Sequence, residues 1–126
     1  MEKQTRAARA VLYIRIATNS NNTNEIDTQR SKCEQHIKES GCDLVGSYVD
    51  EGASGLSLNH PALDRLRADA AAGKFDKIVV FDLARISRNA HAVRLFMDEM
   101  RAHGITVESV KEAGKGSLLW QLKRIK

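Results

Sequence analysis

Cysteine is scarce in this chain of 126 residues, which contains only Cys33 and Cys42. The two thiols do not have the paired spacing of a metal site, and no secretory segment precedes them. We therefore expect both thiols to be reduced in an intracellular protein, with a disulfide between them as the alternative.

Long apolar runs are also absent. No stretch approaches the roughly 20 apolar residues that span a bilayer, and Met1 to Arg6 are not followed by the apolar core of a signal peptide. These absences predict a soluble, cytoplasmic protein without a membrane partner.

The histidine and glycine patterns give no sign of a metal or a cofactor. No two of the histidines are spaced to place two ligands on one turn of a helix. These histidines are His36, His60, His91 and His103. The glycines around Ser54 lack the Gly-x-Gly-x-x-Gly order of a dinucleotide site. We therefore expect neither a bound metal nor a cofactor.

What the sequence does contain is enough for one domain with a modest core, because its apolar fraction is 42%. The net charge is +4 and the isoelectric point is near 9.3. This balance is compatible with a polyanionic partner such as nucleic acid, and equally with an ordinary soluble surface.

Short apolar runs rich in β-branched residues alternate with segments of helical periodicity, which is typical of βαβ units around a parallel sheet. The expected strands are 10–14, 43–49, 77–82 and 105–110. Three helices are expected between or after these strands. The first is capped by Asn24 and closed by Gly41, the second begins at Pro61 and is closed by Gly73, and the third is capped by Asn89 and closed by Gly104. We predict a three-layer α/β domain with a central, mainly parallel sheet of about four strands.

Charged residues follow three of these strands. Arg15 ends the first, Asp50 ends the second, and Arg85 and Arg88 follow the third. Since the carboxyl ends of parallel strands share one edge, these side chains are expected to converge into a phosphate site. The alternative is a set of solvated charges. The carboxylates of Asp50 and Asp82 could together bind a metal or act as an acid–base pair. The favoured interpretation is that they support the arginines through polar contacts.

These residues belong to a longer series of motifs that resembles the catalytic domain of the resolvase/invertase serine recombinases, especially the large serine integrases, over about residues 10–112. The family has Tyr-x-Arg-x-Ser-Thr at a strand end, a glutamine in the first long helix, then Asp-x-Gly-x-Ser-Gly and Arg-x-x-Arg. The matching residues here are Tyr13, Arg15, Thr18, Gln29, Asp50, Gly52, Ser54, Gly55, Arg85 and Arg88.

The resemblance implies a metal-free DNA strand exchange in which a serine attacks a backbone phosphate and arginines stabilise the transition state. It places the nucleophile at Ala17 and the catalytic arginines at Arg15, Arg85 and Arg88. It also implies contacts to the substrate from a second set of side chains. This set is Tyr13, Thr18, Gln29, Asp50, Ser54 and His60.

Ala17 has no hydroxyl group, so the family's covalent route is excluded for this sequence. Thr18 and Ser20 are not expected to replace the serine, because attack requires accurate positioning. His60 stands where the family usually has arginine, and Ala84 stands where it has an aspartate, so Ala84 is not expected to orient an arginine.

These departures favour a naturally degenerate recombinase domain that is catalytically inactive but still binds DNA phosphate. One alternative is an active recombinase inactivated by an engineered serine-to-alanine change. Another is an interaction module that pairs with intact recombinases. The chain could also form a homodimer. A flavodoxin-like small-molecule enzyme would need a ligand fingerprint that the sequence lacks.

The end of the chain, residues 113–126, is basic and amphipathic. We interpret it as a segment that packs on the sheet, with a remnant of a dimer helix or a DNA contact as the alternative. The whole chain is expected to be one domain without a C-terminal DNA-binding domain. Its DNA contacts would therefore be to backbone phosphate, sensitive to salt and weakly selective.

Overall fold

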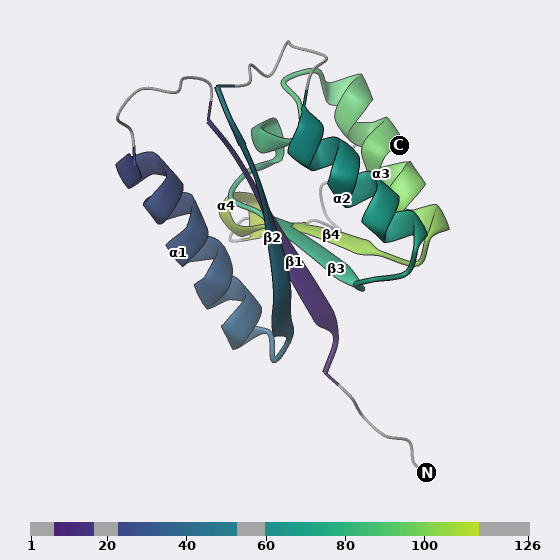
Figure 1. Ribbon diagram of the computed structural model, residues 1–126, viewed down its shortest axis with the longest axis horizontal. Helices are drawn as coiled ribbons and strands as arrows, with labels where there is room; N and C mark the ends of the chain where they lie inside the picture. Colours follow the sequence, from purple (N-terminus) through teal and green to yellow (C-terminus); the bar gives the residue numbers. More distant parts are fainter. Residues whose placement is uncertain (1–6, 17–22, 53–59, 114–126) are drawn as a thin grey trace.

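The strands that the structure describes form one parallel sheet with helices on both faces (Figure 1). The computed structural model describes residues 7–16, 23–52 and 60–113. The strands lie in the order β2-β1-β3-β4. They are β1 (Arg9–Ile16), β2 (Asp43–Glu51), β3 (Lys77–Val80) and β4 (Thr106–Ser109). The predicted parallel sheet of about four strands is confirmed.

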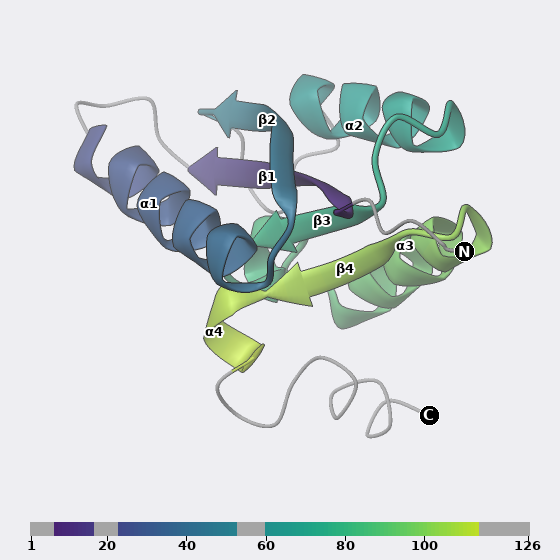
Figure 2. The ribbon, with the colours of Figure 1, turned by 90° about the horizontal axis from the view of Figure 1, so that it is seen from below.

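The helices complete three layers (Figures 1 and 2). Helix α1 (Thr23–Glu39) covers one face of the sheet, and the short α4 (Val110–Ala113) contacts it. Helices α2 (Pro61–Ala71) and α3 (Ala90–Ala102) cover the other face. Between β3 and α3 lies a 3-10 turn, η1 (Leu83–Arg85), which was not predicted from the sequence.

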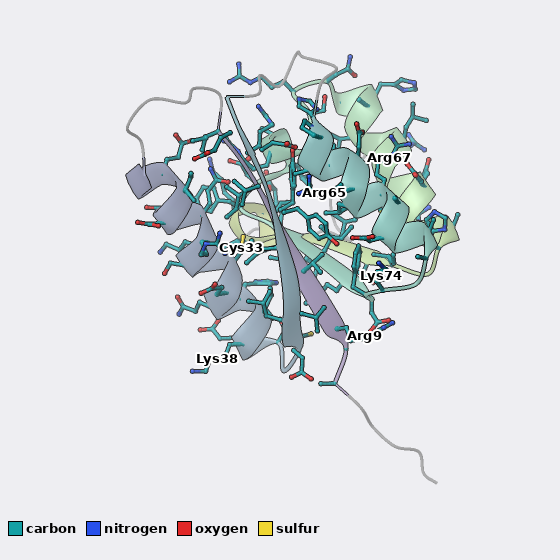
Figure 3. The ribbon with its side chains drawn as sticks, viewed as in Figure 1. Arg9, Cys33, Lys38, Arg65, Arg67 and Lys74 are labelled. Atoms are coloured by element: carbon teal, nitrogen blue, oxygen red, sulfur yellow. The ribbon has the colours of Figure 1, made fainter. Side chains whose placement is uncertain are left out.

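Strand β1 separates two apolar cores. Val11 and Tyr13 pack in the core beneath α2 and α3. Leu12 and Ile14 point the other way, into the core beneath α1. Because β1 lies between β2 and β3 and is covered on both sides, its central residues 10–14 are continuously apolar rather than alternating. The face beneath α1 also buries Cys33, which Figure 3 shows between that helix and the sheet.

The predicted helix ends are largely as expected. The Asn89 side chain accepts a hydrogen bond from the backbone N–H of Ala92 at 3.0 Å and so caps α3. Gly104, with a φ of 77°, follows the end of this helix in the left-handed conformation that favours glycine. Asn24 was expected to be a cap, but α1 begins at Thr23, so Asn24 lies in the first turn.

The third and fourth strands are shorter than predicted. Their pairing ends where Val80 lies beside Ser109. Beyond that point the Phe81 carbonyl accepts a hydrogen bond from the backbone N–H of Lys111, and Val110 already belongs to α4. Phe81 and Asp82 therefore form a bend that leads into η1 rather than the end of a strand.

Some expected features can be checked only within the described ranges. No helix there is long and apolar enough to cross a membrane. Cys33 and Cys42 are both free thiols, as the reduced state requires. The expected tail of residues 113–126 lies outside the described residues apart from its first residue, Ala113.

Candidate functional site

The sheet has a topological switch point at the carboxyl ends of β1 and β3. These strands are neighbours, yet α1, which follows β1 in the chain, covers one face, while α3, which follows β3, covers the other. Open parallel sheets bind ligands outside the carboxyl ends of their strands at such a point. Arg15 near the end of β1 and Arg85 at the end of η1 both lie there.

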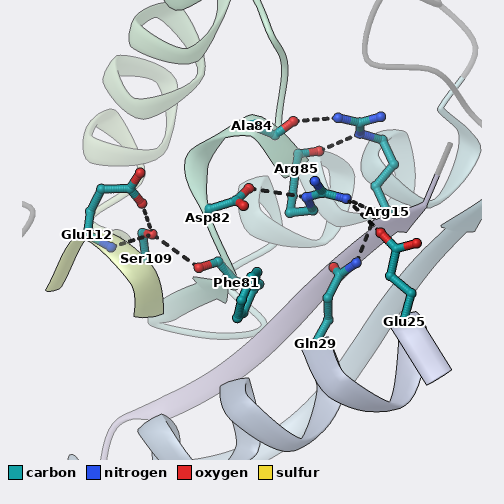
Figure 4. A network of polar contacts seen from close by, with 9 residues as sticks. All are labelled: Arg15, Glu25, Gln29, Phe81, Asp82, Ala84, Arg85, Ser109 and Glu112. Atoms are coloured by element: carbon teal, nitrogen blue, oxygen red, sulfur yellow. Dashed lines mark hydrogen bonds and ion pairs between the residues drawn. The ribbon is translucent and has the colours of Figure 1, made fainter. Parts of the chain in front are cut away.

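Arg15 and Arg85 hold one another through their backbone carbonyls (Figure 4). The Nε of Arg15 donates to the carbonyl of Arg85 at 2.8 Å, and its Nη2 donates to the carbonyl of Ala84. In return, the Nη1 of Arg85 donates to the carbonyl of Arg15 at 2.7 Å. Ala84 therefore does help to orient an arginine, contrary to expectation, because its backbone oxygen acts where its side chain has no polar atom.

The guanidinium groups of Arg15 and Arg85 both remain charged although they lie near one another. Burial, and then the nearby charge of Arg85, lowers the pKa of Arg15, which is 1% exposed. The charge of Arg88 contributes to the same lowering of this pKa, so all three predicted arginines act on one region. Arginine stays protonated in proteins even so, and the region is strongly cationic.

A carboxylate on each side offsets part of this charge. The Oδ1 of Asp82 accepts a hydrogen bond from the Nε of Arg85 at 3.1 Å, which matches the predicted supporting role of Asp82. The Oε2 of Glu25, at the start of α1, lies 3.5 Å from the Nη1 of Arg85. Glu25 was not among the site residues predicted from the sequence.

Gln29 reaches the same place from α1. It is 3% exposed, and its Nε2 donates to the carbonyl of Arg15 at 3.2 Å. Its Oε1 is buried and has no hydrogen-bond partner within the described ranges. Glu25 and Gln29 are four residues apart and so lie on one face of the helix. That spacing was the sequence signal that could have revealed Glu25.

Asp50 serves a different purpose from the one expected. Its Oδ2 accepts hydrogen bonds from the hydroxyl of Tyr13 at 2.7 Å and from the backbone N–H of Leu63 at 3.1 Å. Its Oδ1 accepts from the N–H of Ala62 at 2.8 Å. Asp50 thus caps α2 from a neighbouring strand, while the side chain of His60, the residue before the helix, makes no capping bond.

Burial, more than the hydrogen bond to Asp50, raises the pKa of Tyr13 far above its ordinary value. Tyr13 is therefore a neutral donor inside the protein and not an ionised group facing a substrate. His60 is 8% exposed and lies next to this buried cluster, at the start of α2. Tyr13, Asp50 and His60 thus form a group at the N-terminal end of α2. This group is separate from the hydrogen-bonded pair of Arg15 and Arg85.

Arg88 is exposed and follows η1 on the way to α3. Three further site residues named from the sequence, Ala17, Thr18 and Ser54, lie outside the described residues. In the described part of the chain no cluster of acidic, histidine or cysteine side chains is arranged to hold a metal ion. Chemically, the described cluster offers arginine donors to an anion with several oxygens.

The chain is similar to known proteins in sequence and in fold. The family described as "Resolvase, N terminal domain" matches residues 10–122. A protein of Bacillus subtilis (strain 168) named "Putative DNA recombinase" is 36% identical over 75% of this chain, and the DNA-invertase of Escherichia phage P1 is 29% identical over 80% of it. The chain spans only 19% and 48% of the lengths of these two relatives.

Two solved structures are also similar. The N-terminal catalytic domain of TP901-1 integrase has a TM-score of 0.77 and 27% identity, with coverage of 82% of this chain and 79% of that domain. A resolvase family site-specific recombinase from Streptococcus pneumoniae has a TM-score of 0.74 and 27% identity, with coverage of 83% and 73%.

Proposed function

The chain belongs to the resolvase N-terminal domain family of the serine recombinases, and from this premise we propose that it binds the backbone phosphate of DNA through Arg15, Arg85 and Arg88 without forming a covalent bond to it. The observation that carries the proposal is the mutual hold of Arg15 and Arg85 at the switch point of the sheet.

Arg85 is well suited to this task. Asp82 fixes its Nε and the Arg15 carbonyl fixes its Nη1, so the planar group cannot rotate freely. Among the described residues no hydrogen bond or ion pair involves its Nη2. The Nη end of the guanidinium, which the partly exposed Glu25 carboxylate also approaches, can therefore present two parallel N–H donors to a phosphate. A positioned donor of this kind binds at a lower entropic cost than a flexible one.

Covalent chemistry lacks its nucleophile in this proposal, because the methyl group of Ala17 cannot attack phosphorus. Two of the described hydroxyls at this edge of the sheet are engaged elsewhere. Tyr13 donates to Asp50. Ser109 donates to Glu112. The proposed lack of cleavage therefore depends on Ala17 at the nucleophile position.

The test is binding of a short duplex DNA across a salt series. An Arg85→Ala/Arg88→Ala variant should bind more weakly. The negative slope of log affinity against log salt should become shallower by about two. A Lys74→Ala/Arg101→Ala variant is the matched control, because it removes two exposed cations at the opposite edge of the sheet. Equal behaviour of both variants would refute the phosphate site.

Loss of covalent activity is tested by restoring the hydroxyl. The chain with Ala17 should form no DNA adduct that survives a denaturing gel, whereas Ala17→Ser gains one if the arginines still support the reaction. An adduct with the unmodified chain would overturn the proposed inactivity. A serine codon at position 17 in the natural gene would instead favour an engineered change.

The proposal extends to the setting of the protein. We place it in the cytoplasm as one domain acting on DNA, and pairing with a second copy or with an intact recombinase stays a prediction. If the arginine variants left DNA binding unchanged, co-purification with a full-length relative would become the decisive experiment for the interaction module.

A further inference from the structure

The first turn of α1 places a carboxylate on the arginine that is proposed to bind phosphate. The Oε2 of Glu25 lies 3.5 Å from the Nη1 of Arg85 (Figure 4). This contact is on the Nη side of the guanidinium, away from the Nε that Asp82 occupies. A phosphate that takes both Nη groups of Arg85 must approach from this side.

The two carboxylates around Arg85 differ in how firmly they are held. The side chain of Asp82 is 14% exposed and accepts from Nε at 3.1 Å. The side chain of Glu25 is 40% exposed and lies farther away, at 3.5 Å. A partly exposed ion pair of this length contributes little to stability and is easily exchanged for another anion. Asp82 is thus the more firmly bound carboxylate on Arg85, and the ion pair of Arg85 with Glu25 is the weaker of the two.

Gln29, one turn further along α1, gives an independent sign that this side of the site is incomplete. Its Nε2 is bonded to the carbonyl of Arg15, but its buried Oε1 has no donor within the described ranges. A buried acceptor without a donor is costly. An additional donor that reached the Gln29 Oε1 would therefore stabilise this end of α1.

We propose that Glu25 is an internal competitor for the DNA phosphate: its carboxylate occupies the Nη side of Arg85 in the free protein and must leave when a phosphate binds. This inference rests on the proposed phosphate binding by Arg85 and names how that site is regulated. Binding of DNA is then coupled to a movement of the Glu25 side chain at the first turn of α1.

The test is a set of single and double variants measured against one duplex DNA at fixed salt. Glu25→Gln should bind about two- to five-fold more tightly than the original chain, since it removes the competing charge. Asp27→Asn is the matched control: it removes the same charge from an exposed position two residues along α1. Its gain should be smaller, because only the general electrostatic effect remains.

The Arg85→Ala background separates this inference from the proposed function. In that background the extra gain of Glu25→Gln over Asp27→Asn should vanish, because the two carboxylates no longer differ in what they block. If Arg85→Ala itself leaves binding unchanged, the proposed function fails. If Arg85→Ala weakens binding but Glu25→Gln and Asp27→Asn give equal gains, only the competition is overturned.

Glu25→Asp provides a second variant in case the glutamine change weakens the start of α1. It keeps a negative charge near the helix N-terminus, where the helix dipole favours it, but its carboxylate is one methylene shorter. Thermal unfolding confirms that each variant is folded at the temperature of the assay. The expected result is a gain in affinity without a change in net charge, and an unchanged affinity would contradict the competition.

Discussion

Arg15 and Arg85 each donate a hydrogen bond to the backbone carbonyl of the other, at 2.8 Å and 2.7 Å. Two guanidinium groups this close in a buried setting repel one another. The carbonyl dipoles and the Asp82 carboxylate offset this repulsion, so the pair is held in place before any anion arrives. The pair also joins β1 to η1, which makes the same two residues important for stability and for binding.

Replacing Arg15 with lysine should reveal the structural part of this role. Arg15→Lys keeps the charge but loses the planar fork that reaches the carbonyls of Ala84 and Arg85. We expect the free energy of unfolding to fall by about 1–3 kcal/mol, as measured by urea denaturation. Arg88→Lys, at an exposed position, should change it by no more than about 0.5 kcal/mol. Equal effects would show that the carbonyl bonds contribute nothing.

Asp50 should behave as a helix cap rather than as a DNA contact. All of its described partners are donors, so Asp50→Asn turns an amide group toward at least one of them. The free energy of unfolding should drop by about 1–3 kcal/mol. Tyr13→Phe removes one of the donors, and a double-mutant cycle measures their coupling.

The alternative role for Asp50 makes a different prediction from the same variant. If Asp50 met DNA directly, Asp50→Asn would alter the salt dependence of duplex binding while leaving stability almost unchanged. We expect the reverse at a temperature where the variant is folded: an unchanged salt slope and a lower midpoint of thermal unfolding.

The fold was largely predictable from local patterns. Asn89 and Gly104 are residue types with strong preferences at helix ends, and they bound α3 as expected. The bend at Phe81 was not predictable, because an apolar residue after a β-branched run looks like more strand. The pairing of β3 with both β1 and β4 ends at Val80, and this tertiary pairing stops the strand there.

The site was predictable only in part. The arginines could be placed at one edge of the sheet because parallel strands share that edge. The direction of Asp50 could not, since a carboxylate at a strand end can face a ligand or a neighbouring helix equally well. The contribution of Ala84 comes from its backbone carbonyl, which no side-chain motif encodes.

A second polar cluster, far along α1 from the arginines, predicts a pH dependence of stability. Glu108 accepts a hydrogen bond from Lys77 at 3.0 Å and contacts the Nε2 of His36 at 2.8 Å. Burial alone would raise the pKa of Glu108, but the bonds from His36 and Lys77 outweigh it and hold this pKa below its ordinary value. The cluster ties α1 to β3 and β4.

Because the folded-state pKa of Glu108 is lowered, its contribution to stability is complete above the unfolded pKa of about 4.3. It is lost as the pH falls through the lower, folded-state pKa. Glu108→Gln should therefore be less stable than the original chain at pH 7, by about 1–2 kcal/mol. The gap should close toward pH 3 in urea titrations, and a gap independent of pH would refute the linkage.

The two free thiols should differ sharply in reactivity. Burial, and then the neighbouring charge of Glu34, raises the pKa of Cys33 to about 12, and this residue is 0% exposed in the core beneath α1. Cys42 is only half-buried. Since the thiolate is the reactive form, iodoacetamide at pH 8 should modify Cys42 first and reach Cys33 only on unfolding. Mass spectrometry should show one rapid adduct per chain, none in Cys42→Ser, and two in urea, whereas rapid labelling of folded Cys42→Ser would mean that α1 opens readily from the sheet.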